Sequence, residues 1–308
     1  MIYVRPDKRR NNKDKQMRIA VIFNPVSGRY KVDDVAAIKA ALRQAGHDVT
    51  AYASRHAGDI EIRTREAVET SDLIMAVGGD GTFNEVINGL AGSQVPFLPV
   101  PMGTANVLSF ERGYGRKPAE VAAAVAAMKT VTYAPGIANG RRFVLMASAG
   151  ADAWAVHLVS GKLKKYVGPL AYVWSGLLAF IKHGRQRYRV TVDGRRLDVD
   201  GVIITRARYY GGPFIVAAEA NMESDRLYAV LLESVSFWRI PLVLLAALRG
   251  RLERVAGVRV LRCTQVTVTA DGQTPFQTDG DDRGLLPLQV AVDDRAIKLV
   301  QPAPKAKA

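Results

Sequence analysis

A carboxylate set among glycines is the most informative chemical feature of this 308-residue chain. The run Gly78-Gly79-Asp80-Gly81-Thr82-Phe83-Asn84-Glu85 follows an apolar segment, 73–77, that is typical of a buried parallel strand. Glycines leave backbone N–H groups bare for a polyphosphate, and the dipole of a following helix favours negative charge. Asp80 would repel those phosphates unless a metal such as Mg²⁺ lies between them. We interpret the run as a nucleotide–Mg²⁺ site, although a tight loop without a ligand fits this motif alone equally well.

The elements around this run predict an open parallel sheet. Thr82 and Glu85 have the spacing of a capping box, so a helix is expected to begin at Thr82. Strands separated by helical segments predict a parallel sheet with helices on both faces; the strands are expected at 18–23, 48–53, 73–77 and 97–100. Ligands of such sheets bind outside the carboxyl ends of the strands. The turns at 24–28, 78–81 and 101–106 are therefore expected to converge.

The pattern changes near residue 131. Asn139-Gly140 and Asp193-Gly194 are hairpin signals, the first between strands expected at 132–137 and 143–147, the second between strands at 188–192 and 197–205. Further strands are expected at 227–232, 258–263, 265–269, 288–292 and 296–300, and helices at 151–160, 168–183 and 237–249. The second half is thus expected to be mostly antiparallel β structure.

The net charge of +14 is unevenly distributed, with six Lys/Arg and two Asp in residues 1–16 and eleven Lys/Arg and three Asp in 162–208. Such a surface suits an anionic membrane, a nucleic acid or simple solubility. No aromatic–basic readout motif supports nucleic acid as a partner. Cys263 is the single cysteine, which favours a reducing compartment. Without a signal-like start or a membrane-spanning run, we expect a cytoplasmic protein, with peripheral contact at the inner membrane face and a homo-oligomer as options.

Three motifs follow one another in order: Asn24-Pro25-x-Ser27-Gly28, the Gly78–Val86 run, and Gly103-Thr104-x-Asn106. Together they closely resemble the catalytic domain of the diacylglycerol kinase and sphingosine kinase family, especially its soluble bacterial lipid-kinase branch. The likeness continues through 149–153, 163–172 and 222–227, and ends near 278–281.

The resemblance implies an ATP- and Mg²⁺-dependent lipid kinase with two domains. It implies a doubly wound α/β domain of the phosphofructokinase and NAD kinase type at 17–132, an antiparallel β-sandwich at 133–290, and a returning strand and tail at 291–308. The polar, basic residues 1–16 are expected to form a disordered arm. ATP would lie between the domains. By motif position, the implied nucleotide-binding residues are Asn24, Pro25, Ser27, Gly28, Ser54, Gly78, Gly79, Asp80, Gly81, Thr82, Asn84, Glu85, Gly103, Thr104 and Asn106.

The family's catalytic base lies in an Asp-Gly-Glu motif, which corresponds here to Asp279-Gly280-Asp281, with Asp281 one methylene shorter than the glutamate. The resemblance implies that Asp279, Asp281 and Asp80 share the catalytic and metal roles. An acidic hairpin turn is the alternative. The resemblance also places a structural Mg²⁺ on Asp225 and the carbonyls of Met222 and Leu227, although Arg226 stands where the family has glycine.

Two apolar segments, 167–181 and 237–248, are flanked by basic residues. Each is either an interfacial helix over anionic lipid or a core helix that packs on the sandwich. The expected substrate is a lipid alcohol, diacylglycerol-like or a sphingoid base. An NAD kinase-like small-molecule kinase and a catalytically weak or inactive lipid- or nucleotide-binding homologue are the alternatives, the latter suggested by the changes at Asp281 and Arg226.

Overall fold

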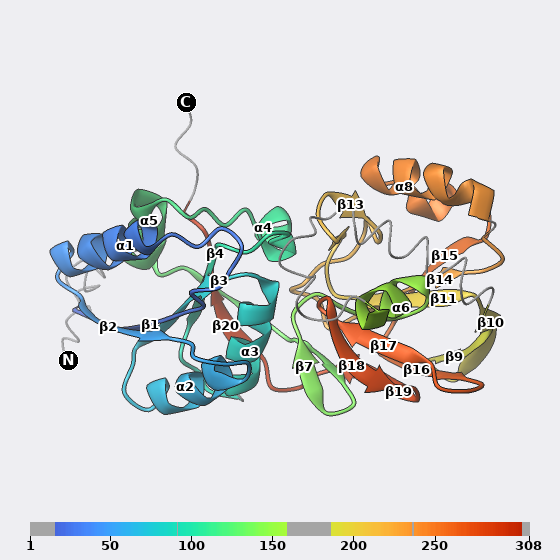
Figure 1. Cartoon of the computed structure of the whole chain (residues 1–308), viewed down its shortest axis with the longest axis horizontal. Helices are drawn as coiled ribbons and strands as arrows, with labels where there is room; N and C mark the ends of the chain where they lie inside the picture. Colours follow the sequence, from blue (N-terminus) through green and yellow to red (C-terminus); the bar gives the residue numbers. More distant parts are fainter. Residues whose placement is uncertain (1–15, 91, 159–185, 236, 304–308) are drawn as a thin grey trace, which may run out of the picture.

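The computed structural model describes residues 16–303, apart from 91, 159–185 and 236, and shows two lobes side by side (Figure 1). The helix expected at 168–183 and nearly all of the basic arm lie outside the described residues. No helix in the part of the chain that is described is long and apolar enough to cross a membrane.

The first domain is built on a sheet with the strand order β2-β1-β3-β4-β20-β5. All neighbouring strands are parallel except β5, which runs antiparallel to β20. Every residue of the central strand β3 is buried, as its apolar sequence requires. The strands are β1 (Arg18–Phe23), β2 (Asp48–Ala53), β3 (Leu73–Gly78), β4 (Phe97–Pro101), β5 (Thr130–Tyr133) and β20 (Ile297–Val300).

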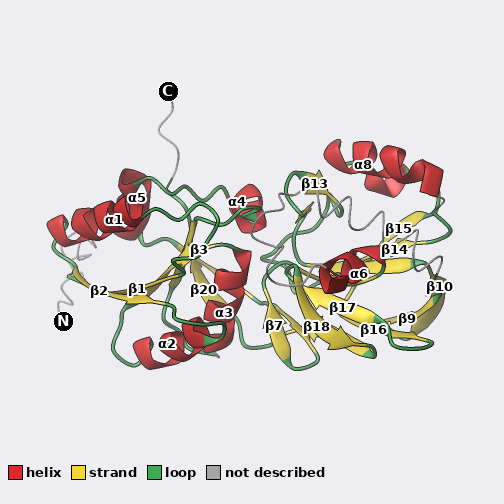
Figure 2. Cartoon of the chain, in the orientation of Figure 1, coloured by secondary structure: helices red, strands yellow, loops and turns green. Residues whose placement is uncertain are grey.

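Helices cover both faces of this sheet (Figure 2). α1 (Val32–Gln44) and α5 (Pro118–Ala127) lie on one face, and α2 (Asp59–Ala67) and α3 (Asp80–Leu90) lie on the other. The short helix α4 (Val107–Arg112) lies at the boundary with the second domain. This arrangement confirms the doubly wound α/β architecture expected from the sequence.

The second domain is a β-sandwich of two antiparallel six-stranded sheets, with the orders β10-β9-β16-β19-β6-β7 and β15-β14-β11-β8-β17-β18. Apolar side chains from both sheets, such as Val190 and Leu288 from one and Ile204 and Leu227 from the other, form a common core. The first sheet contains β6 (Gly136–Ala138), β7 (Arg141–Phe143), β9 (Tyr188–Val192), β10 (Arg195–Val199), β16 (Gln265–Ala270) and β19 (Leu288–Val292). The second contains β8 (Met146–Ala149), β11 (Gly201–Thr205), β14 (Leu227–Leu232), β15 (Val258–Cys263), β17 (Pro275–Thr278) and β18 (Asp281–Leu285).

Smaller elements lie against the second sheet. α6 (Ala151–Leu158) contacts β8, β17 and β18, and α8 (Ile240–Leu248) contacts β13. The hairpin of β12 (Tyr209–Tyr210) and β13 (Phe214–Ile215) lies between α8 and α4, because β13 contacts α8 and β12 contacts α4. The 3-10 turns are η3 (Phe237–Arg239) and η4 (Leu252–Arg254).

Several local expectations were wrong. The strand expected at 132–137 is divided, because β5 joins the first domain and β6 the sandwich, with Pro135 between them. The strands expected at 143–147 and 197–205 are each interrupted in the same way, so β7 and β8, like β10 and β11, lie in opposite sheets. The helix expected from Thr82 begins at Asp80, and no capping box forms, since the Glu85 carboxylate instead accepts the Ile60 N–H at the start of α2 (3.2 Å).

Candidate active site

The three glycine-bearing loops meet at the carboxyl ends of β1, β3 and β4. A Cβ on Gly103 would lie 2.4 Å from Gly79 Cα, so only glycine fits where these two backbones cross. A Cβ on Gly28 would lie 2.5 Å from Thr104 Oγ1, which brings the first loop against the third. The Met102 N–H donates to Gly78 O (2.7 Å) and the Arg29 N–H donates to Met102 O (2.9 Å). The structure therefore brings together the loops that the sequence predicted to converge.

Some of the predicted nucleotide-binding residues shape these loops through their own side chains. Asn24 Oδ1 accepts the Val26 N–H (3.0 Å), and the Asn106 amide bonds both backbone groups of Gly103, at 2.8 and 2.7 Å. Thr82 is buried against Gly78. The predicted residues that are exposed at the mouth of the loops are Pro25, Gly28, Gly81 and Thr104, with Ser27, Ser54 and Gly79 half-buried beside them.

Asp80 lies at the first turn of α3 and caps the neighbouring helix α4. Its Oδ2 accepts the Val107 N–H (2.9 Å) and its Oδ1 accepts the Leu108 N–H (3.2 Å). Burial raises the pKa of Asp80 to about 6, and the negative charge of Asp279 acts in the same direction. The sequence indicated a carboxylate beside phosphates, but the capping of α4 by Asp80 was not predicted.

Asp279 and Gly280 form the two-residue turn between β17 and β18, and both have positive φ, 51° and 81°. This is the type I′ geometry that Asp-Gly favours. The Asp279 carboxylate is fully engaged: it accepts N–H groups of Val144 (2.6 Å), Leu145 (2.8 Å) and Met146 (3.1 Å) and the Asn84 amide (2.8 Å). Since Asn84 belongs to α3, Asp279 ties the hairpin of the second domain to the first. Burial raises its pKa.

Asp281 is the accessible carboxylate of the pair. A Cβ on Gly81 would lie 3.8 Å from Asp281 Oδ2, so the hairpin places this side chain over the start of α3. Its side chain is 37% exposed and lies 3.3 Å from Nη2 of Arg283. The sequence analysis missed Arg283, which also donates to Asn84 Oδ1 (3.4 Å) and to Thr278 Oγ1 (3.0 Å). The hairpin turn that the sequence offered is thus present, and it carries both carboxylates to the start of α3.

Two of the groups expected to hold a structural metal, the Asp225 carboxylate and the Met222 carbonyl, have other partners in the structure. The Asp225 side chain is 77% exposed and pairs with Nε of Arg226 (3.3 Å). The Met222 carbonyl accepts a hydrogen bond from Arg206 (3.0 Å), and Leu227 begins β14 opposite Cys263. The described residues contain no group of three His, Cys, Asp or Glu side chains placed to hold a metal ion.

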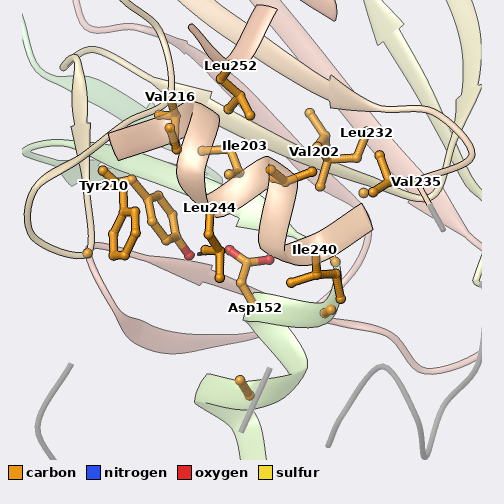
Figure 3. A pocket seen from close by; sticks show the side chains of 18 of the residues that line it. Asp152, Val202, Ile203, Tyr210, Val216, Leu232, Val235, Ile240, Leu244 and Leu252 are labelled. Carbon is orange, nitrogen blue, oxygen red and sulfur yellow. Dashed lines mark hydrogen bonds between the residues drawn. The ribbon is translucent and has the colours of Figure 1, made fainter. Parts of the chain in front are cut away.

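An apolar pocket of about 300 Å³ lies in the second domain between α6, β11 and α8 (Figure 3). Leu232, Val243 and Leu244 are among its aliphatic lining residues, while Asp152 and Tyr210 supply a polar end. The Tyr210 hydroxyl donates to Asp152 Oδ2 (2.7 Å), as the dashed line in Figure 3 shows.

Hydrogen bonds connect this polar end to the acidic hairpin. The Ser148 hydroxyl also donates to Asp152 Oδ2, and Gln277 Nε2 donates to Ser148 Oγ (2.6 Å). Gln277 Oε1 in turn accepts the Gly280 N–H (2.7 Å). Sequence analysis assigned none of these residues a role. Asp152 lies in the segment 149–153 that resembles the family, but most of its partners lie far away in the chain.

Comparison with known proteins agrees with this geometry. Residues 18–136 match the diacylglycerol kinase catalytic domain, and residues 145–301 match the YegS C-terminal NAD kinase beta sandwich-like domain. The chain therefore belongs to the diacylglycerol kinase family and is a kinase, which confirms the resemblance inferred from the motifs.

Individual relatives match along nearly the whole chain. A diacylglycerol kinase of Bacillus subtilis (strain 168) is 29% identical over 300 residues, covering 94% of this chain and 98% of the relative. That of Staphylococcus carnosus (strain TM300) is 26% identical over 284 residues, covering 88% and 90%. A crystal structure of a diacylglycerol kinase from Bacillus anthracis str. Sterne superposes with a TM-score of 0.73 at 19% identity, covering 94% of this chain and 98% of that one. The two-domain fold is thus a known one.

Proposed function

We propose that this kinase transfers the γ-phosphate of ATP, in the presence of Mg²⁺, to the hydroxyl of a lipid alcohol. A diacylglycerol-like alcohol is the first candidate, because the curated relatives are named diacylglycerol kinases, and a sphingoid base is the second. The observation that carries the proposal is the position of Asp281 over the first turn of α3, at the mouth of three converging glycine loops. The apolar pocket, linked to the same hairpin, supports a lipid as the acceptor.

The loops offer what a triphosphate needs. Gly28 and Gly81 are exposed at the mouth of the loops and present backbone rather than side chains, and the N-terminus of the 11-residue helix α3 favours negative charge. Asp80 is the residue that would hold Mg²⁺. A cation fits there, since Asp80 and Asp279 place two half-buried carboxylates within electrostatic reach and the pKa of Asp80 is raised. When bound, the ion would neutralise charge on the transferred phosphoryl group.

Asp281 is the proposed general base, and Asp279 a positioning residue. A base must lie within reach of the attacking hydroxyl. The Asp279 carboxylate accepts four hydrogen bonds, whereas Asp281 is partly exposed and has Arg283 beside it. Asp281 would take the proton of the lipid hydroxyl as the hydroxyl oxygen attacks the γ-phosphorus, and the bond from the γ-phosphorus to the bridging oxygen would break to release ADP. Arg283 would keep the carboxylate pointed towards α3.

The pocket is the proposed site for the apolar part of the lipid. Its aliphatic walls suit acyl chains, and the carboxylate of Asp152 and the hydroxyl of Tyr210 would bind polar groups near the glycerol or sphingoid head. α8 forms one wall through Ile240, Val243 and Leu244.

The outer face of α8 is the proposed membrane contact. Leu242, Leu245 and Leu248 are 49%, 43% and 49% exposed, and Trp238 just before the helix is 84% exposed. Their spacing puts the leucines on one face. Exposed arginines follow, at Arg249, Arg251 and Arg254. An apolar face with adjacent cations suits peripheral binding to an anionic membrane, at the inner face of which a cytoplasmic enzyme would meet its substrate.

The direct test is to incubate the chain with γ-labelled ATP, Mg²⁺ and anionic vesicles carrying diacylglycerol or sphingosine, then extract into organic solvent. We expect label in the organic phase when the vesicles carry one of these two alcohols. Label that appears only in a water-soluble acceptor such as added NAD would instead support an NAD kinase-like activity. ATP binding without transfer to any acceptor would support the inactive homologue.

Variants of the acidic hairpin sharpen this test. Asp281→Asn should lower kcat by about 100-fold or more with little change in ATP affinity, because a general base contributes on that order. Asp281→Glu should keep activity. Asp282→Asn is the matched control, since Asp282 is an exposed neighbour that pairs with His157 (2.8 Å). Equal losses in Asp281→Asn and Asp282→Asn would refute the role given to Asp281.

A further inference from the structure

The loop 221–226, which leads into β14, directs three carbonyl groups at one buried side chain. Arg206 Nη2 donates to the carbonyls of Met222 (3.0 Å) and Ser224 (2.6 Å), and Nη1 donates to the carbonyl of Arg226. The carbonyls come from alternate residues of the loop. Carbonyl oxygens that converge in this way are the ligands expected around a hard cation.

Arg206 is completely buried. It is the largest of the fully buried side chains in the described part of the chain. An arginine is almost never fully buried without partners, since removal of its charge from water is costly. Here the partners are the three carbonyl dipoles, together with the ring of Tyr133, whose centroid lies 5.9 Å from Arg206 Cζ. The planar guanidinium suits this arrangement because its donors are fixed in a fork.

This geometry conflicts with a divalent metal in the same loop. The resemblance to the kinase family placed Mg²⁺ on Asp225 and the carbonyls of Met222 and Leu227. The Met222 carbonyl is bonded to Arg206 instead, and the Asp225 carboxylate is exposed and paired with Arg226. A second cation beside the guanidinium would also meet electrostatic repulsion.

We infer that the guanidinium of Arg206 is a built-in cation that does for the loop 221–226 what a bound divalent metal would otherwise do. The chain would therefore order this loop without metal, whatever ion its phosphate-transfer site requires. The inference does not depend on the proposed substrate.

Arg206 is also placed to act beyond the loop. Its backbone N–H donates to Leu145 O (2.8 Å), and the Leu145 N–H donates to Asp279 Oδ1 (2.8 Å). At the other side, Glu223 of the loop pairs with Arg112 of α4 (2.6 Å). The backbone at Arg206 and the loop that its side chain binds thus lie between the acidic hairpin and the contact of the two domains.

The first test uses the unaltered chain. Hydrogen–deuterium exchange of the peptide covering 221–227 is measured after treatment with EDTA, and again with added Mg²⁺ or Ca²⁺, without nucleotide. Protection of this peptide should be the same in all three samples. An increase in exchange on EDTA treatment, reversed by either ion, would overturn the inference.

The second test compares Arg206→Met with Arg226→Met. Arg206→Met keeps much of the side-chain volume but removes three charge-assisted hydrogen bonds, so exchange in 221–227 should become about tenfold faster or more. Arg226→Met is the matched control, since its carbonyl remains and only the exposed pair with Asp225 is lost. Arg206→Met with full protection of the loop and no metal would count against the inference. If this variant does not fold, the EDTA comparison on the unaltered chain still decides.

Discussion

Asp80 carries a buried charge whose titration can be followed directly. Its carboxylate caps α4 through the N–H groups of Val107 and Leu108, yet burial outweighs these bonds and raises its pKa from the ordinary 3.8 to about 6. The substitution Asp80→Asn replaces the acid by an amide of the same shape that does not titrate.

The direction in which pH changes the free energy of unfolding follows from proton linkage. The folded chain binds the Asp80 proton more tightly than the unfolded chain, so this stabilising contribution is fully present below pH about 4 and is lost as the pH rises through about 6. A rise from 3.8 to about 6 corresponds to at most about 3 kcal/mol, at roughly 1.4 kcal/mol per pH unit. The unfolding free energy of Asp80→Asn minus that of the unaltered chain should therefore grow by up to about 3 kcal/mol between pH about 4 and about 7.

Urea unfolding at several pH values measures this difference, and other titrating groups cancel because both chains contain them. Asp294→Asn is the control, since the Asp294 side chain is 96% exposed. Parallel stability curves for Asp80→Asn and the unaltered chain would refute the raised pKa and the burial that causes it. Asp80→Ala should in addition abolish phosphoryl transfer, and unchanged turnover there would refute the metal-holding role proposed for this residue.

Three further predictions concern the loops, the domain junction and α8. Gly103→Ala should destabilise the chain by about 1–3 kcal/mol in urea unfolding, because its Cβ would lie 2.4 Å from a backbone atom, whereas Gly81→Ala, with 3.8 Å of room, should be neutral or slightly stabilising. Arg142→Met should cost up to about 3–5 kcal/mol in the same assay, since the buried carboxylate of Asp293, 2.5 Å from Arg142 Nε, would keep only Arg295 (3.3 Å) as an ion-pair partner; a loss below about 1 kcal/mol would contradict this. Leu245→Glu should weaken sedimentation with anionic vesicles about tenfold while ATP affinity stays the same, and equal sedimentation would argue against α8 as the membrane contact.

The sequence predicted the convergence of the loops because the information is local. Each loop joins a strand to the next helix, and parallel strands end at the same edge of the sheet. Gly79 and Gly103 could be recognised individually, although the requirement for glycine at both comes from a crossing that only the structure reveals. Asp279-Gly280 was likewise readable as a turn, since an Asp-Gly pair favours positive φ.

The separate roles of Asp279 and Asp281 could not be predicted, because they depend on distant partners. Asn84, which donates to Asp279, lies 195 residues away in the chain. The Asp80 cap on α4 spans 27 and 28 residues, and α4 itself is too short to show a helical period. Only the fold tells which of two similar carboxylates is enclosed by N–H groups and which faces the open end of α3.

Arg226 is a departure from the family pattern that can be interpreted only together with Arg206, the residue that supplies a positive charge to the same loop. In the sequence, arginine in place of glycine after Asp225 was one of the two changes that suggested a catalytically weak or inactive homologue. In the structure the Arg226 carbonyl and two others bond to Arg206, twenty residues earlier, so the cation is covalently part of the chain. A lone arginine at the end of a strand would ordinarily be expected at the surface. The loop therefore lacks an arrangement that suits a metal, because Arg206 already supplies the positive charge that its carbonyl groups need.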